Sequence, residues 1–219
     1  MESTGFTSKA DQVSQTIIDR AVHSDTEESC NNLFSGIGDS QSSDHRIARG
    51  IIFHTLINLG NEELVDQAED DLENAVSPLS RGYYGSLLTL KGGIASENGD
   101  LVRATTLVQE GSEIIDEAVA ADPENITLRF LRLENGIGVS QGSPFDRYEA
   151  IAEDAEFLLE HRELQSGENR ARVLYLAGEV ALGMNDVYTC LDYLEGALRA
   201  APESRWAQKA DMLLWQLEE

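Results

Sequence analysis

The chain has 219 residues, of which 41% are hydrophobic, and 40 acidic residues against 16 basic ones give a formal net charge of -24. This hydrophobic content excludes an acidic disordered tail, and the length is sufficient to bury a core. The negative charge repels phosphate backbones and anionic lipid, so we expect no nucleic-acid partner and no insertion into a membrane.

The N-terminal sequence lacks the basic stretch and apolar run of a secretory signal, and no apolar segment approaches the roughly 20 residues that cross a bilayer. We therefore expect a soluble, cytoplasmic protein. Cys30 and Cys190 belong to no CxxC pair or metal-type cluster, which predicts two reduced and buried thiols.

Apolar residues recur with the period of an α-helix along the chain, and the strict alternation of a β-strand is absent. Near the C-terminus, for example, Trp206, Ala210, Leu213 and Leu217 fall on one stripe. We expect residues 1–7 to be mobile, and glycine-rich breaks at 36–40 and 136–144. In chain order, the pattern predicts helices over residues 8–23, 26–36, 43–59, 62–76, 79–97, 101–121, 124–137, 145–163, 168–183, 187–200 and 203–218.

Three segments end in a similar way, with a small residue in the last helical turn and a proline just beyond it: Ala75–Pro78, Ala118–Pro123 and Ala197–Pro202. Recurrence of such a unit is typical of stacked helix pairs. We therefore predict an all-α fold, a right-handed superhelix of stacked antiparallel helix pairs. It would form a single domain over residues 8–219, in which helix 203–218 caps the last apolar face.

The last unit, Ala171–Ser204, resembles a tetratricopeptide repeat and has that repeat's 34-residue length. Gly178 stands where the family has its first-helix glycine, Ala197 at the small second-helix position and Pro202 at the closing proline. Cys190 replaces the usual alanine. The resemblance implies two closely packed antiparallel helices in this unit.

Residues 80–160 resemble an uncharacterised family of tetratricopeptide-like helical proteins. This resemblance implies a fold but no reaction, and so it carries over no catalytic residue. The matching segments are Tyr83-Tyr84-Gly85, Asp116–Val119, Asp122–Asn125, Arg129–Leu133 and Asp154–Leu159.

No catalytic, cofactor or metal site is recognisable in the sequence. The four histidines lack the spacing of a helical metal site, and no phosphate-binding glycine loop or GxSxG motif is present. The acidic group Asp66, Glu69, Asp70 and Glu73 shares one helix surface, which we interpret as a solvated face because its spacing matches no calcium-binding loop. We expect no cofactor, no metal and no enzymatic activity.

Arg129, Arg132 and Asn135 fall on one side of a helix, in a chain with few basic residues. One interpretation is a clamp for an anion or carboxylate on the inner surface of the superhelix. The alternative is ion pairing between helices, to carboxylates such as Asp116, Glu117 or Asp154. Three further residues are candidates for the same groove: Arg81, Tyr83 and Tyr84.

These patterns favour a non-catalytic adaptor whose inner groove holds a peptide or a helix of another protein. Two alternatives stay open: a small-ligand sensor or enzyme that uses the Arg129 and Arg132 surface, and a structural subunit anchored through Trp206 or Trp215. The oligomeric state is not indicated. The scarcity of lysine and the abundance of acidic residues predict a host with high intracellular salt, against an acidic protein of an ordinary cell.

Overall fold

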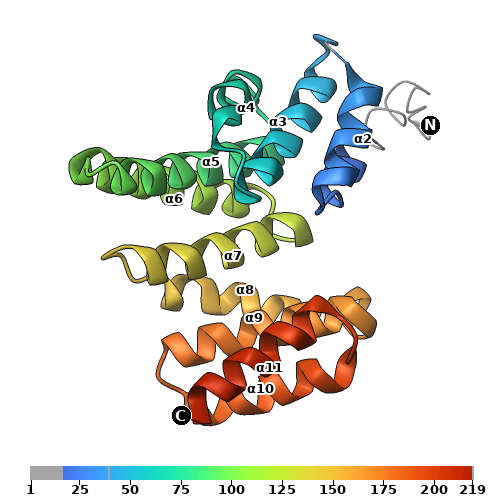
Figure 1. Cartoon of the computed structure of the whole chain (residues 1–219), viewed down its shortest axis with the longest axis vertical. Coiled ribbons are helices and arrows are strands. Elements are labelled where there is room, and N and C mark those ends of the chain that lie inside the picture. The colour runs from blue at the N-terminus through green and yellow to red at the C-terminus, as the bar shows by residue number, and fades with distance from the viewer. Residues whose placement is uncertain (1–16, 39, 219) are drawn as a thin grey trace, which may run out of the picture. The chain divides into compact units, whose positions relative to one another are not determined.

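The computed structural model describes residues 17–38 and 40–218, and every regular element in this part of the chain is helical. The predicted all-α class is therefore confirmed. Residues 17–22 are helical, whereas the rest of the predicted helix 8–23 and the predicted mobile segment 1–7 lie outside the described residues. The elements that follow (Figure 1) are α2 (Glu27–Ile37), α3 (Ser43–Asn58), η1 (Glu62–Leu64), α4 (Val65–Leu72), α5 (Pro78–Glu97), α6 (Leu101–Ala121), α7 (Ile126–Gly142), α8 (Tyr148–Glu160), η2 (Arg162–Leu164), α9 (Gly167–Gly183), α10 (Val187–Ala200) and α11 (Arg205–Glu218).

The predicted helix 62–76 is wrong at its C-terminal end, because α4 ends at Leu72. Residues Ala75–Pro78 therefore connect two helices and do not end one, unlike the segments before Pro123 and Pro202. Ser77 is the N-cap of α5 and accepts a hydrogen bond from the Ser80 amide. Pro78 fits the first helical position because an amide there would have no helical partner.

The predicted break over 136–144 is wrong for residues 136–142, because α7 continues to Gly142 and the chain leaves the helix only at Ser143. Gly136 serves close packing here and does not form a turn: a Cβ atom on it would lie 2.4 Å from Cγ2 of Ile151 on α8. Glycine inside a helix costs about 1 kcal/mol of helix propensity, which the close approach of the two helices offsets.

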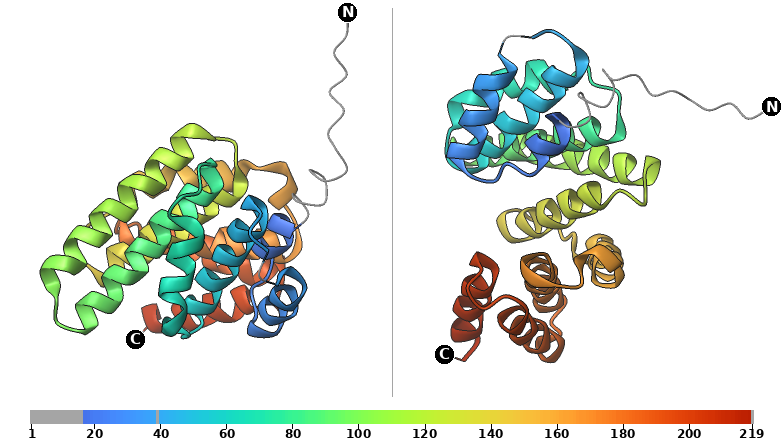
Figure 2. Two further views of the ribbon diagram at one scale, coloured as in Figure 1. Left: turned by 90° about the horizontal axis from the view of Figure 1, so that it is seen from above. Right: turned by 90° about the vertical axis from the view of Figure 1, so that its right-hand side faces the viewer.

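The contacts of the chain cluster into two compact units, which divide between Asp122 and Pro123. The single domain expected from the sequence stays a prediction. In the first unit, α3 packs on α4, and both contact α5. Helices α5 and α6 lie side by side in an antiparallel pair, which the views of Figures 1 and 2 show along their length.

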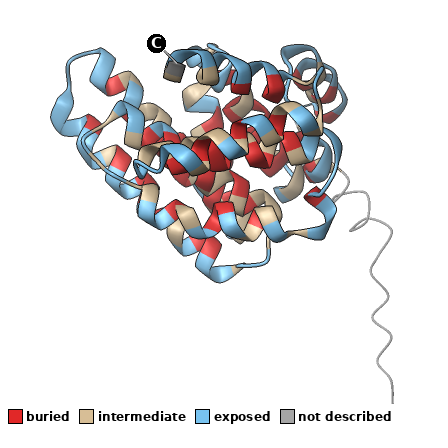
Figure 3. Cartoon of the chain, turned by 90° about the horizontal axis from the view of Figure 1, so that it is seen from below, coloured by how far each residue is buried: buried red, intermediate tan, exposed pale blue. Residues whose placement is uncertain are grey.

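In the second unit, α7 packs on α8, and both contact α9. Helices α9, α10 and α11 each contact the other two. Buried and exposed residues alternate along individual helices (Figure 3), so each helix turns an apolar stripe toward its neighbours. Helix α11 buries Trp206, Ala207 and Ala210 in this way.

The two units are built alike. The turns α5–α6 and α9–α10 have the same backbone hydrogen bonds, in which the amides of Asp100 and Asp186 bond to an alanine carbonyl of the preceding helix. The residue before each aspartate has a positive φ, 81° at Gly99 and 63° at Asn185. Each aspartate side chain then caps the next helix. The sequence therefore repeats a four-helix pattern, α3–α6 and α7–α10.

None of the described helices has both the length and the apolar character that crossing a membrane requires.

Candidate functional site

The predicted pair Arg129 and Arg132 binds the carboxylate of Asp154 on α8. Arg132 donates from Nε at 2.6 Å and from Nη2 at 2.8 Å, and Arg129 donates from Nη1 at 2.8 Å. The Asp154 side chain has 0% exposure, and the two arginine side chains have 13% and 12%. The Arg129 guanidinium also lies 4.8 Å from the centre of the Phe157 ring. This is the ion pairing between helices that the sequence left as the alternative.

The other predicted site residues are divided between the two units. Asn135 lies half-buried on α7, in the second unit. Arg81, Tyr83 and Tyr84 lie on α5, in the first unit, where the Arg81 guanidinium is 5.7 Å from the centre of the Tyr84 ring. Burial raises the pKa of Tyr84, and nearby carboxylates add to this. Tyr83 is buried, and its ring lies perpendicular to that of His54 with the ring centres 5.2 Å apart.

A second arginine–aspartate cluster occupies the first unit, and it was missed in the sequence. Arg49 on α3 donates from Nε at 2.8 Å and from Nη2 at 2.7 Å to Asp71 on α4, and Arg46 adds a bond of 3.2 Å from Nε. Both clusters use the fourth and seventh residues of the first helix and the seventh of the second. The aspartate follows the two arginines by 25 and 22 positions in each case. This repeated spacing of two arginines and one aspartate could have revealed the second cluster in the sequence.

Because each aspartate is buried and accepts hydrogen bonds from two arginines, the two clusters hold α3 on α4 and α7 on α8. An arginine whose hydrogen bonds are directed at a buried carboxylate presents little of its charge to a ligand. The geometry therefore gives Arg129 and Arg132 a structural role in joining two helices.

Another surface lies on the second unit along α7, α9 and α11, and of its residues the sequence indicated only Trp206, as a possible anchor. Its centre is Trp206 of α11, which is 6% exposed. Three cations lie over the Trp206 ring: Lys209 at 4.9 Å, Arg205 at 4.8 Å and Arg172 at 5.4 Å from its centre. The Tyr175 ring is 5.8 Å away. Such cation–π contacts place positive charge on an aromatic surface.

Two carboxylates, one on α7 and one on α9, also belong to this surface. Glu134 of α7 accepts two hydrogen bonds from Arg172, at 3.0 and 2.7 Å. Glu179 of α9 accepts a hydrogen bond from Gln141 at 3.3 Å and faces Tyr175. Burial raises the pKa values of both Glu179 and Tyr175. We call this set the α7–α9–α11 face: Glu134, Gln141, Arg172, Tyr175, Glu179, Arg205, Trp206 and Lys209.

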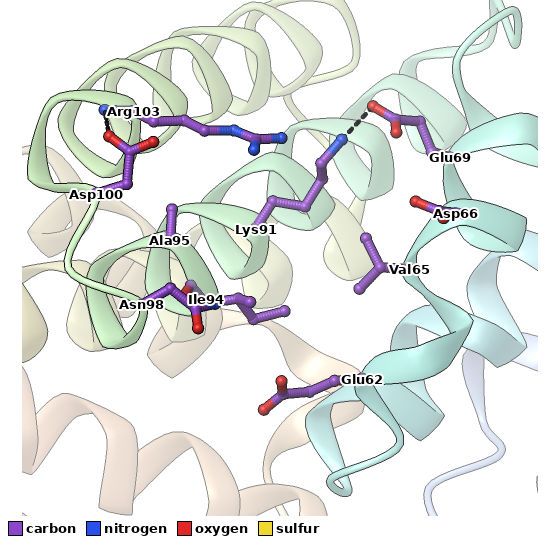
Figure 4. Close-up of a pocket in the computed structure, with 10 residues that line it drawn as sticks. All are labelled: Glu62, Val65, Asp66, Glu69, Lys91, Ile94, Ala95, Asn98, Asp100 and Arg103. Atoms are coloured by element: carbon purple, nitrogen blue, oxygen red, sulfur yellow. Dashed lines mark hydrogen bonds and ion pairs between the residues drawn. The ribbon is translucent and has the colours of Figure 1, made fainter.

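The first unit has a surface cleft of about 400 Å³ between α4, α5 and the start of α6. Figure 4 shows Lys91 extending toward Glu69, to which it donates a bond of 2.5 Å, while the Arg103 side chain extends along the same wall. Four carboxylates and two cations line an open depression, and this mixed arrangement selects no particular ligand charge. The lining residues are Glu62, Val65, Asp66, Glu69, Lys91, Ile94, Ala95, Asn98, Asp100 and Arg103.

One Ser–His contact lies in the core of the first unit. His54 Nε2 is 2.8 Å from Ser86 Oγ, and burial lowers the pKa of His54 to about 4. Ser86 is 5% exposed and His54 is 7% exposed. Neither residue lines the cleft, so this contact gives no route for a substrate to reach the serine hydroxyl.

Among residues 17–38 and 40–218, no group of three or more histidine, cysteine, aspartate or glutamate side chains is arranged to hold a metal ion. Cys30 and Cys190 are free and fully buried, as expected.

No protein-family model matches this sequence, and comparisons with curated proteins and with solved structures give no significant match.

Proposed function

We propose that this protein is a non-catalytic binding module, built from tetratricopeptide-like helix pairs, that holds a peptide or a helix of another protein on the α7–α9–α11 face. In the right-handed superhelix that we propose, α7, α9 and α11 are the first helices of successive pairs. First helices of such arrays line the inner, concave surface, which is the usual binding surface.

The observation that carries this proposal is the gathering of three cations over Trp206. The chain has 16 basic residues and a net charge of -24, so three cations on one tryptophan ring are a marked local exception. Trp206 itself is buried, so the exposed Arg205 and Lys209, and not the ring, are presented to a ligand. Arginine is among the residues that contribute most to protein interfaces. The face therefore suits a ligand segment that combines carboxylates with apolar side chains.

The anion-binding alternative at Arg129 and Arg132 has less support, because Asp154 already accepts hydrogen bonds from both arginines. The alternative of a structural subunit has support of its own in Trp215, which is 62% exposed on α11.

The test is affinity purification of the full chain from its source cells at their own salt concentration, followed by mass spectrometry. A double variant, Arg205→Glu with Lys209→Glu, removes two cations from Trp206. Its matched control, Arg103→Glu with Arg199→Glu, makes the same charge change at exposed positions elsewhere.

We expect one partner to be recovered with the wild type and with the control, and to be lost with the double variant. The purified partner should then bind the purified wild-type chain and the control variant, but not the double variant. Recovery of the bait alone, or equal binding by both double variants, contradicts the proposal.

A further inference from the structure

Helix α11 follows α10 as α7 follows α6, so in the four-helix pattern it takes the place of α7 and α3. Ser42, Asn125 and Ser204 are each followed by one of these helices, and each side chain accepts a hydrogen bond from the amide of the third helical residue. The segments before α7 and α11 also share a proline and a glutamate, Pro123-Glu124 and Pro202-Glu203. Residues can therefore be compared by their position in the three helices.

The same face of α3 and of α7 is covered by a second helix. The fourth and seventh residues of each are the arginines that bind Asp71 or Asp154. The eighth residue of α3, Gly50, lies against Leu72 of α4, and the eleventh residue of α7, Gly136, lies against Ile151 of α8. This face is therefore a helix-binding surface twice within the chain.

On α11, the corresponding residues are Gln208, Asp211, Met212 and Trp215. Met212 is 59% exposed and Trp215 is 62% exposed. In α7, the residues at these two positions, Leu133 and Gly136, are both buried. No described helix covers this face of α11, which lies opposite the residues that pack on α9 and α10.

The sizes of the paired residues indicate what could cover it. Where the eighth or eleventh position of the first helix is a glycine, the covering helix supplies a large side chain, Leu72 or Ile151. Counted by helix position, the place of Leu72 falls on Ala155 in α8, and the place of Ile151 falls on Ala68 in α4. We infer that these alanines face the large residues at the same positions of the first helices, Leu133 in α7 and Phe53 in α3. Met212 and Trp215 are both large, so they require two small residues.

The charges indicate which residue of a covering helix would lie opposite Asp211. In α3 and α7 the seventh residue is an arginine that faces an aspartate, whereas in α11 it is Asp211, which is exposed. A helix placed as α4 and α8 are placed would bring its own seventh residue to Asp211. An acidic residue there would be repelled, and a basic one would complete a salt bridge with the polarity reversed.

We propose that Met212, Trp215 and Asp211 form a docking face for an amphipathic helix of a partner protein, with small residues at its fourth and eighth positions and a lysine or arginine at its seventh. This inference rests on the proposed binding function and adds a second, separate contact to it. An aromatic anchor in a helix–helix contact contributes strongly to affinity.

The probe is a synthetic peptide with the sequence of residues 146–161, which includes α8, carrying Ile151→Ala and Asp154→Arg. Its own Ala155 already supplies the second small residue. Binding of the fluorescently labelled peptide to the full chain is measured by anisotropy at one fixed salt concentration. A second peptide carries Ile151→Ala alone and keeps the aspartate.

We expect saturable binding of the arginine peptide to the wild-type chain, weakened at least about tenfold by Trp215→Ser and by Asp211→Arg. The Asp211→Arg chain should instead prefer the aspartate peptide. The matched control is Tyr188→Ser, because Tyr188 is 86% exposed on α10 and belongs to neither proposed surface. Circular dichroism establishes that all variants keep the wild-type helicity.

Absence of saturable binding to the wild type, or equal binding by the Trp215→Ser chain, overturns the proposal. A concentration-dependent dimer that Trp215→Ser abolishes assigns the face to a second copy of the chain and also overturns it. None of these outcomes decides the function proposed above. That function is tested by whether a partner is recovered with the wild type and lost when Arg205 and Lys209 are replaced.

Discussion

Arg132 donates two parallel hydrogen bonds to Asp154, whose side chain has no exposure to solvent. Such a bidentate pair fixes the angle and register of two helices as well as their separation. The equivalent pair in the first unit, Arg49 with Asp71, has the same two-bond arrangement. The chain thus uses the same arrangement twice, to join α3 to α4 and α7 to α8.

Removal of the shared carboxylate should destabilise the second unit. Asp154→Ala leaves two nearly buried guanidinium groups without their acceptor, and breaking a buried pair in this way costs about 3–5 kcal/mol. Glu156→Ala, at an exposed position of α8, is the control and should change stability by less than about 0.5 kcal/mol. Denaturant unfolding measures both, and a similar cost for the two variants would contradict the role of Asp154.

The close approach of α7 and α8 depends on the absence of a side chain at Gly136. Gly136→Ala should cost about 1–3 kcal/mol, because the new methyl group would meet Ile151 at 2.4 Å. Gly138→Ala, two residues along the same helix, meets nothing within 4 Å and should stabilise the protein by about 0.5–1 kcal/mol. Thermal melting shows whether each variant is less or more stable than the wild type. Because Ile151→Ala removes the group that the new methyl meets, the double variant should cost less than the sum of the two single changes.

The buried imidazole of His54 should make stability depend on pH. Burial lowers the pKa of His54 from 6.5 in the unfolded chain to about 4 in the folded one. Between these values the unfolded state binds a proton that the folded state does not, so stability falls as the pH drops from 6.5 toward 4. Above pH 6.5 both states are neutral and this contribution is constant. The full difference is about 3 kcal/mol.

The measurement for His54 is the free energy of unfolding from pH 7 to pH 4, compared between the wild type and His54→Gln. The variant should lose a large part of the slope, whereas His23→Gln, at an exposed position, should keep it. Identical slopes in all three proteins would show that His54 does not couple to folding.

The charge predicts a rise in melting temperature with salt. Several of the 16 basic residues form internal ion pairs. The acidic side chains outnumber them, and those left without a cation repel one another. The Debye length falls from about 10 Å at 0.1 M salt to about 3 Å at 1 M, so this repulsion weakens. We expect the melting temperature to increase between about 0.1 M and 3 M KCl. A constant or falling value would contradict adaptation to high salt.

The helical class and most helix positions could be predicted from the sequence, because an apolar stripe with a 3.6-residue period and a capping residue are local signals. The predicted ranges for α6 and α10 coincide with the observed ones. The predicted helix 145–163 overran α8 at both ends, and further errors fell at Leu72 and at Gly136. At Gly136 the local signal has two meanings. A glycine can interrupt a helix or allow a second helix to approach it, and only the presence of Ile151 decides between them.

The candidate site shows the same division. The sequence by itself placed Arg129 and Arg132 on one side of a helix and named Asp154 among their possible partners. Only the tertiary structure decided that Asp154 lies between them, and it also brought Arg172 of α9 onto Trp206, whose other two cations, Arg205 and Lys209, are near neighbours on α11. Periodicity determines which way a side chain faces from its own helix. What it meets depends on the packing of other helices, which short-range sequence patterns do not encode.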